Sequence, residues 1–318
     1  MQTPFTQEAD FRQERDFGQK ISAVFDFIRA HWRPLGRVLL YLVLPAALVQ
    51  NILSVLVQRQ MTGAMQAALQ NQGAGLGGVV QAQRTMFSNV MSSPVYWVNS
   101  VLGTAFFALL ILSIYGYVLA LAQRRTPGPE VTVAEVWATV KREFIGTYFS
   151  VWGVFLLIGA GMFVLLVPGI YLSVALSLFF IVKVAEGTGF FDTLGRCLRL
   201  TRGKWWSTFG LILVMILLLY VVLMGVGIAA TLLSGGLKAV VTSSQEPSSL
   251  YPVVVASISS AMMLLLYPPL LLVLAFQYFN LVERKDGVGL HQLVSSLGQS
   301  AAPQARNASY QPDEEGEY

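Results

Sequence analysis

Five long stretches of this chain contain neither a charged residue nor a histidine. They cover residues 38–57, 97–122, 149–182, 207–233 and 252–282. A helix needs about 20 apolar residues to cross about 30 Å of hydrocarbon. Inside lipid the backbone must also satisfy its own hydrogen bonds, which favours helices for such stretches. The sequence therefore predicts an all-α integral membrane protein.

The overall composition supports this class. Only 12% of the residues are charged, whereas soluble domains carry about 25%. The net charge of +4 is modest and favours basic loops beside a membrane over nucleic-acid binding. The first apolar stretch begins late, after a polar and charged segment, so we interpret it as a retained span and not as a cleaved secretory signal.

The third stretch is too long for one span. A single helix over residues 149–182 would measure about 51 Å at about 1.5 Å per residue. It is interrupted by Val167, Pro168 and Gly169. Proline disfavours helix in the residue before it and suits the first turn of a new helix. The sequence therefore predicts a tight hairpin turn at Pro168 and Gly169.

This turn gives six predicted spans. They cover approximately residues 38–57, 97–122, 149–167, 170–184, 207–233 and 252–282. The fourth span is short, which leaves open whether it crosses fully or is re-entrant, with Lys183 extending outward at its end.

The distribution of positive charge supports six spans. With both termini on the cytoplasmic side, all 21 Lys and Arg residues fall in inner segments except Arg59, Arg84 and Lys238. A single span over residues 149–182 would divide the cations almost evenly between the two sides. Because cytoplasmic loops are enriched in Lys and Arg, the first arrangement is strongly preferred.

A threefold pattern precedes the first, third and fifth spans. Residues 17–32, 133–144 and 190–198 each carry an apolar stripe at helical spacing. Thr132 and Glu135 have the spacing of a capping box at the start of the second of these segments. Each stripe is followed by cations and aromatic residues and then by two spans. We therefore expect three transmembrane hairpins, each preceded by a cytoplasmic interfacial amphipathic helix.

The predicted organisation has three parts. Residues 1–16 form a polar N-terminal arm, residues 17–298 form the six-span membrane domain, and residues 299–318 form a disordered acidic tail.

Four cations stand directly before the fifth span and form what we call the basic cluster. They are followed by two tryptophans, which suit the headgroup level of a bilayer. The residues are Arg196, Arg199, Arg202 and Lys204, then Trp205 and Trp206. One interpretation is that the cluster anchors and orients the chain. The other is a specific contact with anionic lipid headgroups or with a partner. Nucleic-acid binding is disfavoured, because the aromatic residues lie at bilayer depth.

Little else in the sequence suggests chemistry. Lys183 and Glu186 are three residues apart and are predicted to form an interfacial ion pair, with a gate or a headgroup contact as the functional alternative. There is a single cysteine, Cys197, and only two histidines, far apart at 31 and 291. We find no nucleophile–base set, phosphate loop or metal-ligand spacing, so no catalytic residue, metal or cofactor is predicted.

One segment resembles a known family. Pro168-Gly169-Ile170 is followed by Glu186-Gly187 and then by Leu200-Thr201-Arg202-Gly203-Lys204. This order resembles the bacterial six-span family named after the membrane domain of glycerophosphoryl diester phosphodiesterases, and related membrane proteins of unknown function. Cys197 departs from the serine that is commoner in that family.

The resemblance implies a location in the bacterial inner membrane. It does not imply phosphodiesterase activity, because in those enzymes catalysis belongs to a separate TIM-barrel domain, whose paired histidines and acidic residues we do not find here. It supplies no catalytic or transport residues.

We therefore expect a non-enzymatic multi-span protein that serves as a membrane scaffold or lipid-interacting module. Its expected partners are anionic lipid headgroups, with a second protein or another copy of the chain as further candidates. The alternative is a transporter or flippase for a lipid or an apolar small molecule. The absence of charges inside the spans argues against ion coupling, and a flux assay in liposomes would test the alternative.

Overall fold

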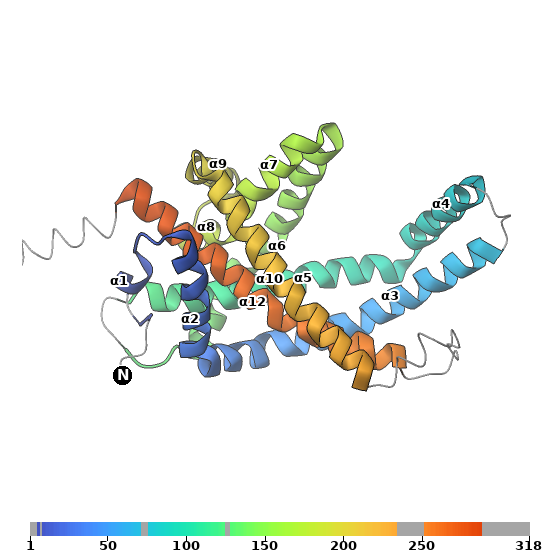
Figure 1. Ribbon diagram of the computed structural model, residues 1–318, viewed down its shortest axis with the longest axis horizontal. Helices are drawn as coiled ribbons and strands as arrows, with labels where there is room; N and C mark the ends of the chain where they lie inside the picture. Colours follow the sequence, from blue (N-terminus) through green and yellow to red (C-terminus); the bar gives the residue numbers. More distant parts are fainter. Residues whose placement is uncertain (1–4, 7, 71–75, 125–127, 234–250, 288–318) are drawn as a thin grey trace, which may run out of the picture.

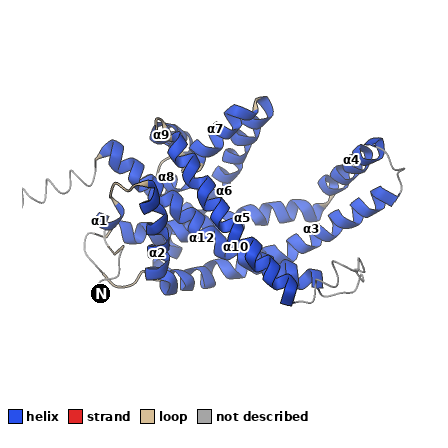
Figure 2. Cartoon of the chain, viewed as in Figure 1, coloured by secondary structure: helices blue, strands red, loops and turns tan. Residues whose placement is uncertain are grey.

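The computed structural model describes residues 5–6, 8–70, 76–124, 128–233 and 251–287. All the secondary-structure elements in this part of the chain are helices (Figure 2). Six helical segments are long and apolar enough to cross a membrane: Phe17–Met61, Pro94–Ala122, Val133–Phe163, Leu166–Glu186, Trp205–Ala229 and Leu266–Asp286. The predicted helical class and the six apolar segments are confirmed, and they are compatible with a multi-pass membrane protein.

The first apolar segment is part of one long helical stretch. It comprises α2 (Phe17–Val38), the π-helix η1 (Leu39–Val43) and α3 (Leu44–Gln70). The sequence suggested a separate helix ahead of the span, but here the two are continuous. The stretch instead bends at His31, whose φ is −113° and ψ 15°, one turn before Pro34. A proline inside a helix removes a backbone hydrogen bond and causes such a kink.

The next two helices form an arm with α3. They are α4 (Leu76–Ser92) and α5 (Pro94–Ala122), separated by Ser93 in an extended conformation. Pro94 starts α5 at a position where the missing amide hydrogen has no helical partner to lose. The arm extends to the right in Figure 1, while the second half of α5 runs back into the protein core.

The pair α6 (Val133–Val164) and α7 (Leu166–Leu176) corrects the predicted turn. The Thr132 hydroxyl caps α6 by accepting from the Glu135 amide at 3.3 Å, which is one half of the predicted capping box; the Glu135 carboxylate pairs with Arg124 instead. The chain reverses at Leu165, where φ is −155° and ψ 133°, and not at Pro168 and Gly169. Pro168 lies in the first turn of α7, where its missing amide hydrogen is tolerated.

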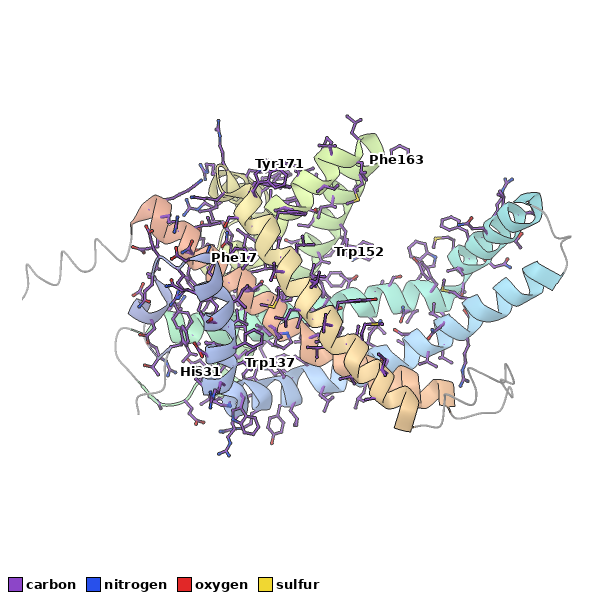
Figure 3. The ribbon with its side chains drawn as sticks, viewed as in Figure 1. Phe17, His31, Trp137, Trp152, Phe163 and Tyr171 are labelled. Carbon is purple, nitrogen blue, oxygen red and sulfur yellow. The ribbon has the colours of Figure 1, made fainter. Side chains whose placement is uncertain are left out.

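Gly169 serves close packing instead of the turn. A Cβ atom built on it would lie 2.7 Å from the Cα of Met162 in α6. On the α6 side, a Cβ atom on Gly161 would lie 3.2 Å from the Cα of Gly169. Two glycines therefore allow the backbones of α6 and α7 to approach each other beside the tip of the pair, where Phe163 points away from the protein (Figure 3).

Four further helices complete the part of the chain that the structure describes. They are α8 (Phe179–Glu186), α9 (Phe190–Thr201) and α10 (Trp205–Leu233), followed by α12 (Tyr251–Asp286). The core lies where α5, α8 and α12 meet, since residues 110–118, 178–184 except Phe180, and 271–282 are buried there. From this core the α3–α5 arm, the α6–α7 pair and the α10–α12 pair extend in different directions (Figure 1).

The N-terminal segment differs from the predicted polar arm. Phe5 and Phe11, the latter in the short helix α1 (Glu8–Phe11), are both buried in the core. They form an aromatic group with Phe27 of α2 and Phe276 of α12, with ring centroids 5.3–6.1 Å apart. The predicted acidic tail, residues 299–318, lies outside the described residues.

Candidate functional site

The structure divides the predicted basic cluster into an internal cation and three exposed ones. The internal one is Arg196 on α9. Its Nε donates to Glu186 Oε1 at 2.9 Å, and its Nη2 pairs with Asp286 at the end of α12. Tyr278 also donates to Glu186, at 3.2 Å. The hydrogen bond to Asp286, foremost, raises the pKa of Arg196 above its ordinary value. Arg196 therefore links α8, α9 and α12, which is a structural role.

The junction between α9 and α10 is a shaped turn. Gly203 has a φ of 82°, a left-handed conformation that glycine adopts without strain. Lys285 of α12 donates to the carbonyl oxygens of Arg199 and Arg202. These carbonyls belong to the end of α9, where the last carbonyl groups have no amide donor from a following helical turn. A cation is favourable there because the C-terminal end of a helix carries partial negative charge. The backbone of the junction is thereby fixed to α12.

The side chains of this junction face outward. Arg199, Arg202 and Lys204 are exposed, and Trp206 is 77% exposed. Trp205 lies instead against α7: its ring stacks on Tyr171 with centroids 5.9 Å apart, and its Nε1 donates to the Tyr171 carbonyl. Tyr171 lies at the same end of the molecule as the junction (Figure 3). The sequence could not tell which tryptophan would pack inside.

The predicted ion pair between Lys183 and Glu186 is corrected by the structure. Glu186 is the last residue of α8 and its carboxylate turns to Arg196 on α9. Lys183 turns to α6, where its Nζ lies beside Gly146. An arginine that bridges two carboxylates satisfies more hydrogen bonds than a single lysine contact would, which accounts for the exchange of partners.

No protein-family model, curated protein or solved structure matches this chain. The resemblance to the six-span membrane-domain family therefore stays a prediction. Any function has to be argued from the geometry of these residues.

Sequence reasoning missed the docking of the N-terminal segment. Arg15 is buried and its guanidinium lies 5.3 Å from the centroid of the Phe276 ring. It donates to the carbonyl oxygens of Phe11 and Asp10, and burial lowers its pKa. Asn280 of α12 donates to the Arg15 carbonyl at 3.1 Å. A polar Asn280 within an apolar span was the one sequence signal of this contact, because buried amides need partners.

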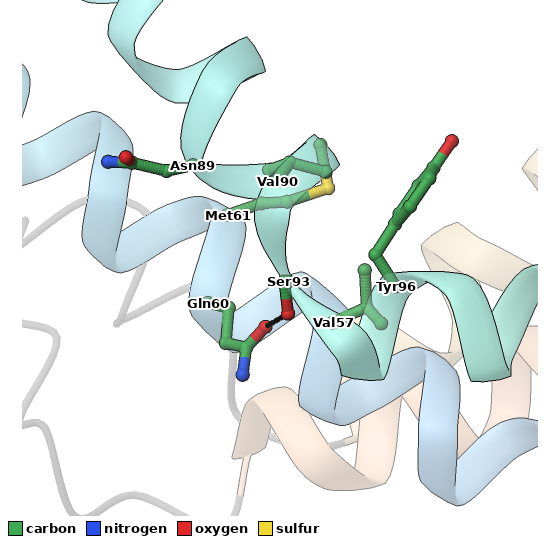
Figure 4. Close-up of a pocket in the computed structure, with 7 residues that line it drawn as sticks. All are labelled: Val57, Gln60, Met61, Asn89, Val90, Ser93 and Tyr96. Atoms are coloured by element: carbon green, nitrogen blue, oxygen red, sulfur yellow. Dashed lines mark hydrogen bonds between the residues drawn. The ribbon is translucent and has the colours of Figure 1, made fainter.

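The Cys197 thiol and the pocket between α3, α4 and α5 offer little chemistry. Burial raises the pKa of the Cys197 thiol to about 12, so it is not an available nucleophile at neutral pH. A pocket of about 250 Å³ lies between α3, α4 and α5, beside a hydrogen bond from Ser93 to Gln60 (Figure 4). It is smaller than the usual range of about 300–1,000 Å³ for ligand pockets. The described residues contain no group of three potential metal ligands.

Proposed function

We propose that this chain is a non-enzymatic multi-span membrane protein that binds anionic lipid headgroups. The observation that supports this most directly is the α9–α10 junction. Arg199, Arg202 and Lys204 are exposed there beside an exposed Trp206, directly before the most apolar of the candidate spans. Such a junction places cations at phosphate depth and an indole at headgroup depth.

The electrostatic contribution can be estimated. Each cation near an anionic leaflet contributes about 1 kcal/mol, so three contribute about 3 kcal/mol at low salt. This attraction falls off within about 8–10 Å at physiological ionic strength. Binding by this surface should therefore prefer phosphatidylglycerol to phosphatidylcholine and weaken as salt rises.

The orientation belongs to the same proposal. Arg59 on α3 and Arg84 on α4 lie in the arm, away from the α9–α10 junction. The junction and the end of α12 carry many more cations. By the positive-inside rule we infer that the junction faces the cytoplasm of a bacterial cell, with both termini on that side of the inner membrane.

Lipid retention tests the proposal. The variant is Arg199→Gln combined with Arg202→Gln and Lys204→Gln, and the control is Arg59→Gln combined with Arg84→Gln. Arg196 stays intact because its loss would disturb the ion pairs that link three helices. Native mass spectrometry in mild detergent would count the phosphatidylglycerol and phosphatidylcholine molecules that each protein retains.

We expect the triple variant to lose its preference for phosphatidylglycerol, whereas the control keeps it. Equal retention of phosphatidylglycerol by the wild type, the triple variant and the control would show that the junction is not a headgroup site.

A further inference from the structure

A buried lysine near the end of α8 lacks a counter-ion. The side chain of Lys183 is only 8% exposed, and it lies three residues before the end of a candidate span. Among the residues that the structure describes, no ion pair or hydrogen bond reaches its ammonium. An ammonium taken out of water without a partner is costly, so this charge requires an explanation.

The ammonium lies at a notch in α6. A Cβ atom built on Gly146 would be 3.5 Å from Lys183 Nζ and 3.7 Å from its Cε. Gly146 itself is exposed on the outside of the helix bundle. Because glycine has no side chain, nothing of Gly146 covers the ammonium on this side. Lys183 as a whole is therefore buried, while its charged end lies directly behind exposed Gly146, at the outer side of α6.

The acidic groups nearest in the chain are already engaged. Glu186 accepts from Arg196 and Tyr278, and Glu143 pairs with Arg142 at 3.0 Å. The Gly146 carbonyl accepts from Ser150 at 2.7 Å. The next residue of α6, Thr147, has a buried hydroxyl oxygen without a partner within the described part of the chain. Thr147 is itself fully buried, so of these two groups only the Lys183 ammonium, which lies beside exposed Gly146, can be reached by a ligand from outside.

The surroundings of the notch are suited to a lipid. Ile145 and Phe149 flank Gly146 and are 70% and 67% exposed, which gives an apolar surface beside the charge. Arg142, one turn earlier on the same helix, is exposed and pairs with Glu143. An acyl chain gains from the apolar surface, whereas a free phosphate ion does not. A zwitterionic headgroup would bring its own cation next to the Lys183 ammonium.

We propose that Lys183 and the Gly146 notch form a binding site for the phosphate of one anionic lipid headgroup. This site rests on the proposed function, which it extends from a general basic surface to one defined lipid position. The charge-assisted contact would run from Lys183 Nζ to a phosphate oxygen, with the acyl chains lying along Ile145 and Phe149.

Two variants and a matched control test the site. Lys183→Met removes the charge and keeps an apolar stem, so folding is expected to be preserved or improved. Gly146→Leu fills the notch. Gly159→Leu is the control, because Gly159 lies on the same helix, is exposed and has nothing within 4 Å of its added Cβ position. Retention of phosphatidylglycerol would be measured by native mass spectrometry at increasing collision energy, and affinity by lipid titration.

We expect the wild type and Gly159→Leu to retain one phosphatidylglycerol that Lys183→Met and Gly146→Leu lose, with affinity lower by about tenfold or more for that position. If inorganic phosphate binds the lipid-free protein at this position as tightly as phosphatidylglycerol does, the acyl chains contribute nothing, the site binds a free anion and the lipid assignment is wrong. Unchanged retention by both site variants would also overturn it.

The outcomes separate this site from the α9–α10 junction. If only the Arg199, Arg202 and Lys204 variant loses lipid, the proposed function stands and the Lys183 site fails. If only Lys183→Met and Gly146→Leu lose lipid, the site stands and the junction fails. If the wild type retains no phosphatidylglycerol, both fail together.

Discussion

Gly169 gives a stability prediction that follows directly from distances. In Gly169→Ala the new methyl carbon would lie 2.4 Å from Met162 Cγ and 2.7 Å from Met162 Cα and N. Carbon atoms pack best at about 3.5–4.0 Å. A change of the Met162 rotamer could move Cγ away but not the backbone atoms. Helices α6 and α7 would therefore have to separate by about 1 Å.

The expected effect is a net loss of stability. Overpacking of this kind costs about 1–3 kcal/mol, while replacing glycine by alanine within a helix returns about 0.5–1 kcal/mol. The free energy of unfolding should therefore fall, by up to about 2.5 kcal/mol. Gly159→Ala is the matched control: it lies on α6 with open space around it, so it should be neutral or slightly stabilising.

The assay is equilibrium unfolding in detergent, followed by tryptophan fluorescence. A second variant sharpens it: Met162→Ala combined with Gly169→Ala removes the clash with Cγ but leaves the clash with the backbone, so it should recover only part of the loss. If Gly169→Ala is as stable as Gly159→Ala, the close crossing of α6 and α7 is wrong.

Three further predictions concern the charged end of the molecule. Arg196→Met should lower the free energy of unfolding by about 1–3 kcal/mol, because two partly buried carboxylates lose their cation. The control Arg199→Met should change the free energy of unfolding little in the same assay. Equal effects of the two variants would contradict a structural role for Arg196 alone. Asn280→Leu leaves the Arg15 carbonyl without its hydrogen-bond donor, so limited proteolysis should cleave the N-terminal segment faster than in the wild type. An unchanged cleavage rate would mean that the hydrogen bond from Asn280 to Arg15 does not hold the N-terminal segment in place. The Cys197 pKa of about 12 exceeds its ordinary value of 9.0, so the unfolded chain loses this proton first. The free energy of unfolding should therefore fall as pH rises from about 9 to 12. At pH 8, maleimide should label Cys197 only when the protein unfolds. Rapid labelling of the folded protein would show that Cys197 is not buried.

The hydrophobic pattern was sufficient to predict the class of fold, but not where the chain turns. Pro168 and Gly169 are the strongest breakers between the third and fourth spans, and the sequence placed the turn there. The structure turns at Leu165, because the proline fits the first helical turn and the glycine is needed for the contact with Met162. Whether a glycine serves a turn or a crossing depends on the neighbouring helix, which local sequence does not specify.

The basic cluster shows the same limit for function. Four cations within nine residues were visible in the sequence, yet only the fold separates Arg196, which bridges Glu186 and Asp286, from Arg199, Arg202 and Lys204, which stay exposed. Asp286 is 90 residues away from Arg196 in the chain, so no local spacing could have indicated this pairing.

The sequence by itself determined that this chain is helical and has six segments fit for a membrane. The length of each apolar segment and its lack of charged residues decide whether it can cross a membrane, because the cost of burying a polar group in lipid depends on that group alone. Only the tertiary structure decided which partner each polar residue has. It pairs Glu186 with Arg196, and it leaves Lys183 at the Gly146 notch. Partners are set by how helices distant in the chain pack, and packing depends on all of them together.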